Sequence, residues 1–146
     1  MGYSQVLSAY RETGVKTASQ GKLIIMLYDE AVKQLGMAVS WFDSDLKADP
    51  HKIELANQNI LKTQEIITEL MASLDMEAGG EIARNLFSLY VYFNHELLEG
   101  NISKDRGKIA SVRDLMDQLR LTWHEVVNST PVQAQMSMPA GLNITG

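Results

Sequence analysis

The sequence predicts an all-α protein, an elongated antiparallel four-helix bundle with a short N-terminal helix and a disordered C-terminal tail. Three observations predict this fold class. Apolar residues recur at helical spacing in four long segments, no segment shows the apolar–polar alternation of a strand, and no proline interrupts the four segments. Four long helices with short connections pack most simply when each lies antiparallel to its neighbour in sequence.

The 146 residues are expected to form one domain with three parts: a lead (1–18), a bundle (19–127) and a tail (128–146). The tail contains no charged residue, has two prolines and shows no periodicity. Such a segment has little to hold it in one conformation at a chain end, so we predict that it is disordered.

The lead is expected to hold a short helix between Tyr3 and Thr13. Its apolar residues fall at helical spacing and form one small face: Tyr3, Val6, Leu7 and Tyr10. A helix of this length is unstable alone in water, so it needs a surface to dock on. Two hypotheses follow. The lead covers a partner-binding groove as a lid, or Tyr10 packs into the end of the bundle and contributes stability.

The first long helix is expected to begin after Ser19, whose hydroxyl can cap the amides of the first turn, and to end near 43–48. Gly36 lies in its middle, where Gly costs about 1 kcal/mol relative to Ala, and suggests the close approach of another helix. The core face is Ile24, Leu27, Tyr28, Ala31, Leu35, Ala38 and Phe42. Four residues widen this face: Ile25, Val32, Val39 and Leu46.

The second long helix is expected to begin at Pro50, because a proline in the first position loses no hydrogen bond, with Asp49 as its cap. Gly79 and Gly80 then separate it from the third long helix. The inner face of the second helix is Ile53, Ala56, Ile60, Ile67, Met71 and Leu74.

The third long helix is expected to end at Gly100 in the C′ position, and Ser103 is expected to cap the fourth. The inner face of the third helix is Ile82, Leu86, Leu89, Tyr90, Phe93 and Leu97. The fourth carries the seam Ile109, Val112, Met116, Leu119 and Trp123.

Composition excludes several classes of function. The net charge of −5 argues against nucleic-acid binding, which needs a basic surface. No apolar run approaches the roughly 20 residues of a membrane span, so no membrane insertion is expected. The N-terminus does not have the basic-then-apolar order of a signal peptide, and cysteine is absent. These features predict a cytoplasmic protein.

Motifs for catalysis are incomplete. His95-Glu96 and His124-Glu125 begin like a zinc-protease motif, but the second histidine is missing in both. No Glu-x-x-His pair, phosphate-binding loop or nucleophile elbow occurs. We therefore predict a protein that is not an enzyme and has no metal site and no cofactor. One alternative is a phosphotransfer bundle that uses an exposed His95, although a solvated polar histidine explains the same residue.

The distinctive feature is surplus apolar surface, because a bundle helix needs only one apolar stripe. The first helix carries Leu23, Met26, Met37 and Trp41 roughly 120° away from its core stripe. The second and third helices carry further apolar residues on their backs: Leu55 and Ile66, and then Phe87, Val91 and Leu98. Three interpretations remain: wide core contacts, a homo-oligomer, or a surface for another protein. The candidate partner-binding residues are Tyr10, Leu23, Met26, Leu55, Ile66, Phe87, Val91 and Leu98.

Several segments together resemble the FliS family of flagellar export chaperones. The first helix is entered through V-K-T-A-S (15–19) and L-I-I-M-L-Y-D (23–29), the second carries N-I-L-K-T-Q-E-I-I-T-E-L (59–70), and the fourth ends in Leu119-Arg120-x-x-Trp123. The resemblance covers roughly residues 10–127. The sequence departs from the family pattern at Gln20 and Glu30, where the family often has Pro and Gly; both residues favour helix.

The resemblance implies a cytoplasmic chaperone that binds the C-terminal segment of flagellin, prevents premature polymerisation and delivers it to the flagellar type III export gate. Flagellin and the export gate are thus the expected partners. A homodimer is an alternative way to bury the spare faces.

Overall fold

The computed structural model describes residues 18–129, and the side chains of residues 21–128. These residues form four long helices without a strand: α2 (Ala18–Phe42), α3 (Pro50–Ala72), α4 (Gly80–Ser103) and α5 (Arg106–Ser129). The all-α prediction is confirmed for this part of the chain. The expected short N-terminal helix and the chain beyond residue 129 lie outside the described residues. The last helix runs two residues past the expected bundle end at 127.

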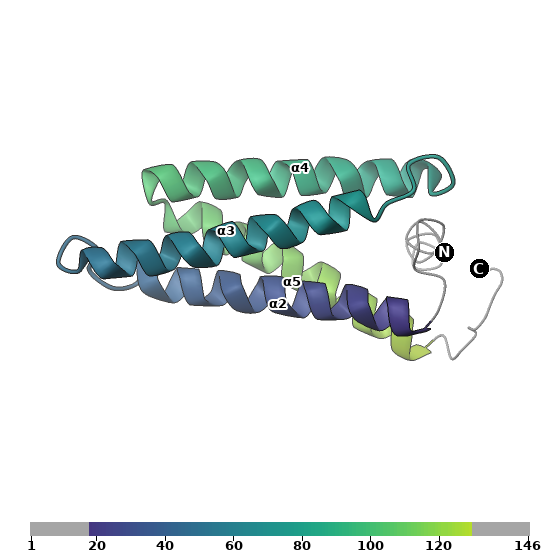
Figure 1. Cartoon of the computed structure of the whole chain (residues 1–146), viewed down its shortest axis with the longest axis horizontal. Coiled ribbons are helices and arrows are strands. Elements are labelled where there is room, and N and C mark those ends of the chain that lie inside the picture. Colours follow the sequence, from purple (N-terminus) through teal and green to yellow (C-terminus); the bar gives the residue numbers. More distant parts are fainter. Residues whose placement is uncertain (1–17, 130–146) are drawn as a thin grey trace.

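The four helices form an elongated bundle in which sequence neighbours lie antiparallel (Figure 1). Each helix packs mainly against two others: α2 lies against α3 and α5, and α4 lies against the same two helices. This closed arrangement surrounds one core. It leaves the outer side of every helix facing solvent.

Aromatic side chains from three helices fill the centre of the core. Tyr28, Tyr90 and Trp123 are almost fully buried, and the hydroxyls of Tyr28 and Tyr90 hydrogen-bond to each other. The rings of Tyr28 and Trp123 lie 6.4 Å apart, a distance at which tilted aromatic pairs attract. The predicted inner faces of all four helices are buried or half-buried, as periodicity indicated.

A chain of buried amides joins α2 to α3. Gln34 donates to Glu30 (2.6 Å), Asn59 donates to Gln34 (2.8 Å), and the indole Nε1 of Trp41 donates to Asn59 (3.1 Å). Each side-chain amide is therefore both donor and acceptor. Because a slip along the helix axis would leave buried polar groups unpaired, this chain fixes the register of the two helices.

Aspartates cap the starts of α3 and α5. The Asp49 carboxylate accepts from the amide of His51 (3.1 Å), with Pro50 in the first turn, as predicted. At α5 the predicted cap is wrong: Ser103 is the last residue of α4, and the Asp105 carboxylate accepts from the amides of Gly107 and Lys108. Ser19 is not a cap either, because α2 already includes Ala18.

The predicted roles of two helical glycines are wrong. Gly100 does not end α4; Lys104, with φ of 55°, takes the left-handed position, and Gly100 is buried inside the helix. A Cβ on Gly100 would lie 2.8 Å from Cδ1 of Ile109 and 3.1 Å from Cβ of Lys108, so this glycine lets α5 approach α4 closely. Gly36 marks no such approach, because a Cβ there would meet nothing within 4 Å.

These glycines give a matched pair of variants. Gly36→Ala is expected to stabilise the protein by about 0.5–1 kcal/mol and to raise Tm by a few degrees, because Ala restricts the unfolded chain and meets open space. Gly100→Ala is expected to lower Tm despite the same gain in helix propensity, because its methyl group crowds Ile109. Thermal unfolding followed by circular dichroism measures both. An equal rise in Tm for the two variants would contradict the close approach.

Candidate partner-binding surface

The outer side of α4 carries an apolar stripe, which we call the α4 face: Phe87, Val91, Leu98 and Ile102. Their exposed fractions lie between 37% and 74%. At about 100° per residue they fall within one 60° sector, on the opposite side of the helix from Leu86 and Phe93. The exposed stripe predicted from Phe87, Val91 and Leu98 is therefore present. Ile102 was missed, although its position four residues after Leu98 places it on the same side.

The edge between α3 and α4 runs beside this face. Asn101 donates to Asn57 (2.7 Å), and Gln64 donates to the backbone carbonyl of Asn94 (3.2 Å). The two bonds connect α3 to α4 at points about two turns apart along each helix. Asn94 Oδ1 is buried and has no hydrogen-bond partner among the described residues.

Leu61 extends the apolar surface onto α3. It lies between Asn57 and Gln64 on the side of α3 that faces α4, and it is exposed. Leu98 lies between Asn94 and Asn101 on α4, so the two leucines flank the same edge. The sequence interpretation missed Leu61, which lies on the opposite side of α3 from the buried residues Thr63 and Leu70.

The two residues proposed on the back of α3 are less accessible than predicted. Ile66 is 8% exposed and belongs to the core, so its predicted exposure is wrong. Leu55 is half-buried. Both lie at the flank of the core stripe, which a helix with two neighbours covers. Ile66 also contributes to a shallow depression on α3 with Lys62, Glu65, Thr68, Glu69 and Ala72. Tyr10 lies outside the described residues.

A second apolar surface, the α2 face, consists of Leu23, Met26 and Met37. Their exposed fractions lie between 40% and 63%. Trp41 falls on the same side but is half-buried, since its indole is held against α3 by Asn59. Leu23 and Met26 lie in the first turns of α2, and Met37 follows about three turns later.

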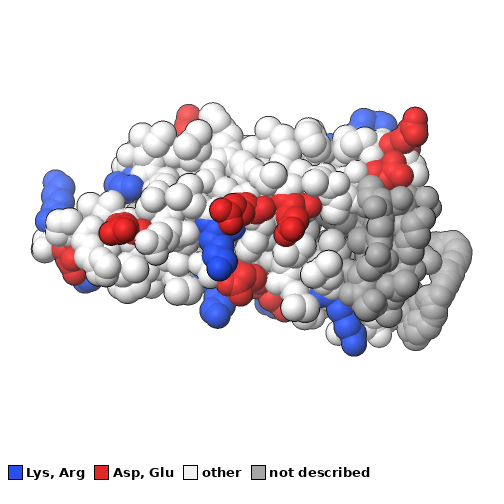
Figure 2. Space-filling view, viewed as in Figure 1, with Lys and Arg blue, Asp and Glu red and all other residues white. Residues whose placement is uncertain are grey.

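Two charged residues, Glu30 and Lys33, fall between Met26 and Met37 on the same side of α2 as the α2 face. Figure 2 shows a largely uncharged surface over α4, while charges on this side gather over the middle of α2 and α3.

Between α2 and α5, Asp29 accepts from Arg120 (3.3 Å) and pairs with His124 (3.0 Å). The pKa of Arg120 is raised, first by its hydrogen bond to Asp117 and also by that to Asp29, against partial desolvation.

A further cluster lies on the side of α4 that meets α5. His95 pairs with Glu99 (3.3 Å), and Lys108 reaches Glu96 (3.4 Å) and Glu99 (3.7 Å). The pKa of Lys108 is raised, chiefly by the charge of Glu96. Ligand atoms of the histidine and the two glutamates lie within 4.8 Å of one another, but the Lys108 ammonium pairs with both carboxylates and would compete with a metal ion for them. A phosphoryl group on His95 would meet the Glu99 carboxylate, which disfavours phosphotransfer there.

Together these observations describe an elongated scaffold with two apolar, solvent-facing surfaces on α2 and on α4 with the adjoining edge of α3. Such surfaces suit an amphipathic helix or an extended apolar segment, which would lay its own apolar side on them. None of the described helices has the length and hydropathy that crossing a membrane requires.

Comparison with known proteins identifies the group to which this chain is similar. The model of the family "Flagellar protein FliS" matches residues 3–130. The flagellar secretion chaperone FliS of Bacillus subtilis strain 168 is 29% identical over 129 residues, which cover 88% of this chain and 91% of the relative. The proteins of the same name from Salmonella typhimurium and Escherichia coli K12 are 33% and 32% identical, over 79% and 78% of this chain and 82% and 80% of theirs.

Proposed function

Because the chain belongs to the FliS family of flagellar secretion chaperones, we propose that it binds the C-terminal segment of flagellin in the cytoplasm, prevents its premature polymerisation and delivers it to the flagellar type III export gate. In this role it acts by binding, without catalysis and without a cofactor. The relatives are named as secretion chaperones, and this supports a role in flagellar export.

The observation that carries the proposal is the α4 face with Leu61. Five large apolar side chains are exposed along one side of the α3–α4 pair, although the core is complete without them. Exposed apolar surface of this kind is unfavourable in water, so it indicates a surface that another chain covers. Phe87, Val91 and Leu98 are proposed as its main contacts, with the α2 face residues Leu23 and Met26 as a second contact. Leu55 and Ile66 would contribute only where they reach the surface.

The physical chemistry of the cargo fits this surface. A segment that is unfolded before assembly and apolar on one side would associate with other copies if left free. Binding as helices against apolar grooves hides that side, and the cost of ordering the segment is offset by a large interface. Release then requires only that the export machinery compete for the segment, so no nucleotide hydrolysis by the chaperone is needed.

Binding to flagellin from the same organism tests the proposal. The purified chain is expected to retain full-length flagellin in a pull-down and to lose it when the C-terminal segment of flagellin is removed. Isothermal titration with the isolated segment then gives affinity and stoichiometry. Equal retention of full-length and truncated flagellin would contradict the proposed site of recognition, and retention of neither would contradict the proposed cargo.

The lead gives a second prediction. If residues 1–12 cover part of the flagellin surface, with Tyr10 in contact with it, deleting them should tighten or speed flagellin binding and increase self-association of the free protein. A lid lowers apparent affinity by the fraction of time for which it is closed. Stopped-flow binding and light scattering measure the two effects. Weaker binding together with a lower Tm would instead show that the lead is a structural part of the bundle.

A further inference from the structure

Asn94 lies at the border of the α4 face. It comes three residues after Val91 and four before Leu98, so the helical period places it on the same side of α4 as these exposed residues. Its backbone carbonyl accepts from the side chain of Gln64 on α3 (3.2 Å), which puts Asn94 at the α3–α4 edge that Leu61 flanks. The surface proposed for flagellin therefore includes an amide side chain among its apolar residues.

The carboxamide of Asn94 makes no hydrogen bond within the part of the chain that the structure describes, and its Oδ1 is buried. Asn101, two turns later on α4, differs: its carboxamide donates to Asn57 (2.7 Å) and accepts from Lys104 (3.0 Å). A buried carbonyl oxygen without a partner destabilises the free protein. Asn94 as a whole is only half-buried, so its carboxamide can turn toward the surface about the Cα–Cβ bond, and this turn breaks no hydrogen bond.

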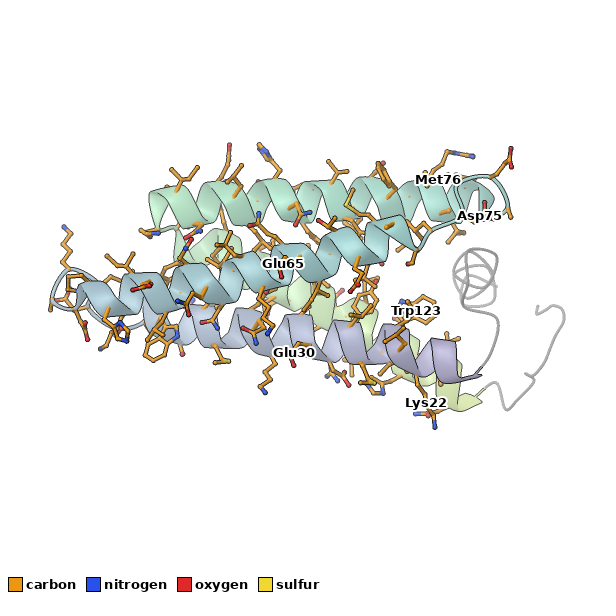
Figure 3. All side chains as sticks on the ribbon, viewed as in Figure 1. Lys22, Glu30, Glu65, Asp75, Met76 and Trp123 are labelled. Atoms are coloured by element: carbon orange, nitrogen blue, oxygen red, sulfur yellow. The ribbon has the colours of Figure 1, made fainter. Side chains whose placement is uncertain are left out.

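The surroundings of Asn94 favour a neutral partner. The residues one turn away from it on α4 carry no charge: Tyr90, Val91, Leu97 and Leu98. Across the edge, Glu65, in the middle of α3 (Figure 3), falls on the other side of Leu61 from Gln64. A cationic donor bound at Asn94 would lose its water without meeting a carboxylate at this edge, whereas a neutral amide or hydroxyl group loses less on leaving water.

A segment bound as a helix has to supply this partner from a side chain, because backbone amides inside a helix already donate to carbonyls four residues earlier. We propose that Asn94 is a specificity-determining residue of the flagellin surface. Its carboxamide hydrogen-bonds to one neutral polar side chain, an Asn, Gln, Ser or Thr, that the bound segment carries among its apolar residues. A segment with an apolar residue at that position would leave the Asn94 amide covered and unpaired, and would bind more weakly. This proposal rests on the function proposed above and adds the chemical class of one recognised residue.

A double-mutant cycle with the isolated C-terminal segment of flagellin tests the proposal. Asn94→Leu replaces the carboxamide by an apolar group of similar shape. It should weaken binding of the segment by about 5-fold to 150-fold, because the donor of the segment is then buried without a partner. Each Asn, Gln, Ser and Thr of the segment is also replaced by Ala in turn. At one of these positions the replacement should abolish the effect of Asn94→Leu to within about 2-fold in isothermal titration.

Thermal unfolding of the free protein distinguishes recognition from a structural role. Asn94→Leu is expected to raise Tm, because it removes the unpaired buried oxygen. Asn101→Leu makes the same change two turns away and is expected to lower Tm, because it leaves Oδ1 of Asn57 without its donor. Asn85→Leu is the control for affinity: Asn85 is exposed on the opposite side of α4 from Asn94, so this variant should bind the segment like the wild-type chain.

Unchanged or tighter binding by Asn94→Leu would overturn the proposal, and so would an equal loss of affinity with every variant of the segment. A lower Tm together with weaker binding would also overturn it, because this combination indicates a structural role. Asn94→Ala removes the same amide without adding bulk and provides the same comparison if Asn94→Leu does not fold. Absence of binding by the wild-type chain would overturn the flagellin proposal as well, which distinguishes its failure from that of the Asn94 contact alone.

Discussion

Phe87→Asp and Val91→Asp are each expected to lower the affinity for the C-terminal segment of flagellin by about 30-fold to several thousand-fold. The corresponding loss of about 2–5 kcal/mol is that of an unpaired charge buried at an interface. In the complex, the apolar segment would cover the new carboxylate and remove its water without supplying a partner. Isothermal titration of each variant against the isolated segment measures the effect.

The same variants are expected to remain folded. Phe87 is 37% exposed and Val91 is 46% exposed, so an aspartate at either position can keep its carboxylate in water in the free protein. Leu121→Asp is the matched control, because it replaces an apolar residue of similar exposure on α5 and should bind flagellin with unchanged affinity. If Phe87→Asp and Val91→Asp unfold, the α4 face is part of the core. If they bind normally while folded, flagellin does not use this face.

Periodicity predicted the four helices and their inner faces, because apolar residues that repeat every 3.6 residues lie on one side of a helix, and that side is buried. The Asp49–Pro50 helix start was equally predictable, since cap and proline act within one turn. The start of α5 was harder, because Ser103 and Asp105 are both good caps. The choice between them depends on where α4 ends, which the left-handed Lys104 determines.

What the sequence could not determine depends on contacts between helices. Gly100 resembles a helix terminator, but its role depends on Ile109, which packs where a side chain would be. Leu61 and Ile66 are similar residues on one helix. Their opposite exposures follow from the way α3 is turned toward its neighbours. The Asp29–Arg120 ion pair joins residues 91 positions apart, and no local signal marks it.

Trp123→Ala is expected to have the largest effect on stability, a loss of about 3–5 kcal/mol in the free energy of unfolding. The indole is 1% exposed, and its ring lies 6.4 Å from that of Tyr28, whose hydroxyl in turn bonds to Tyr90. Truncation therefore leaves a cavity where α5, α2 and α4 meet, and the surrounding aromatic rings are too constrained to fill it. Urea unfolding followed by circular dichroism measures the loss without relying on tryptophan fluorescence.

A variant of the second tryptophan, Trp41, tests whether the loss of stability in Trp123→Ala comes from the central position of Trp123. Trp41 is half-buried, and Trp41→Phe removes its hydrogen bond to Asn59 while leaving most of the ring in place. This change should cost only about 1–2 kcal/mol, the cost of a partly unpaired buried amide. Equal losses for the two variants would contradict the central position of Trp123. At a temperature where Trp123→Ala is still folded, this variant should bind flagellin with unchanged affinity. The reason is that Trp123 is buried in the core and lies on neither apolar face. Weaker binding would mean that the packing of the core also determines the shape of the two faces.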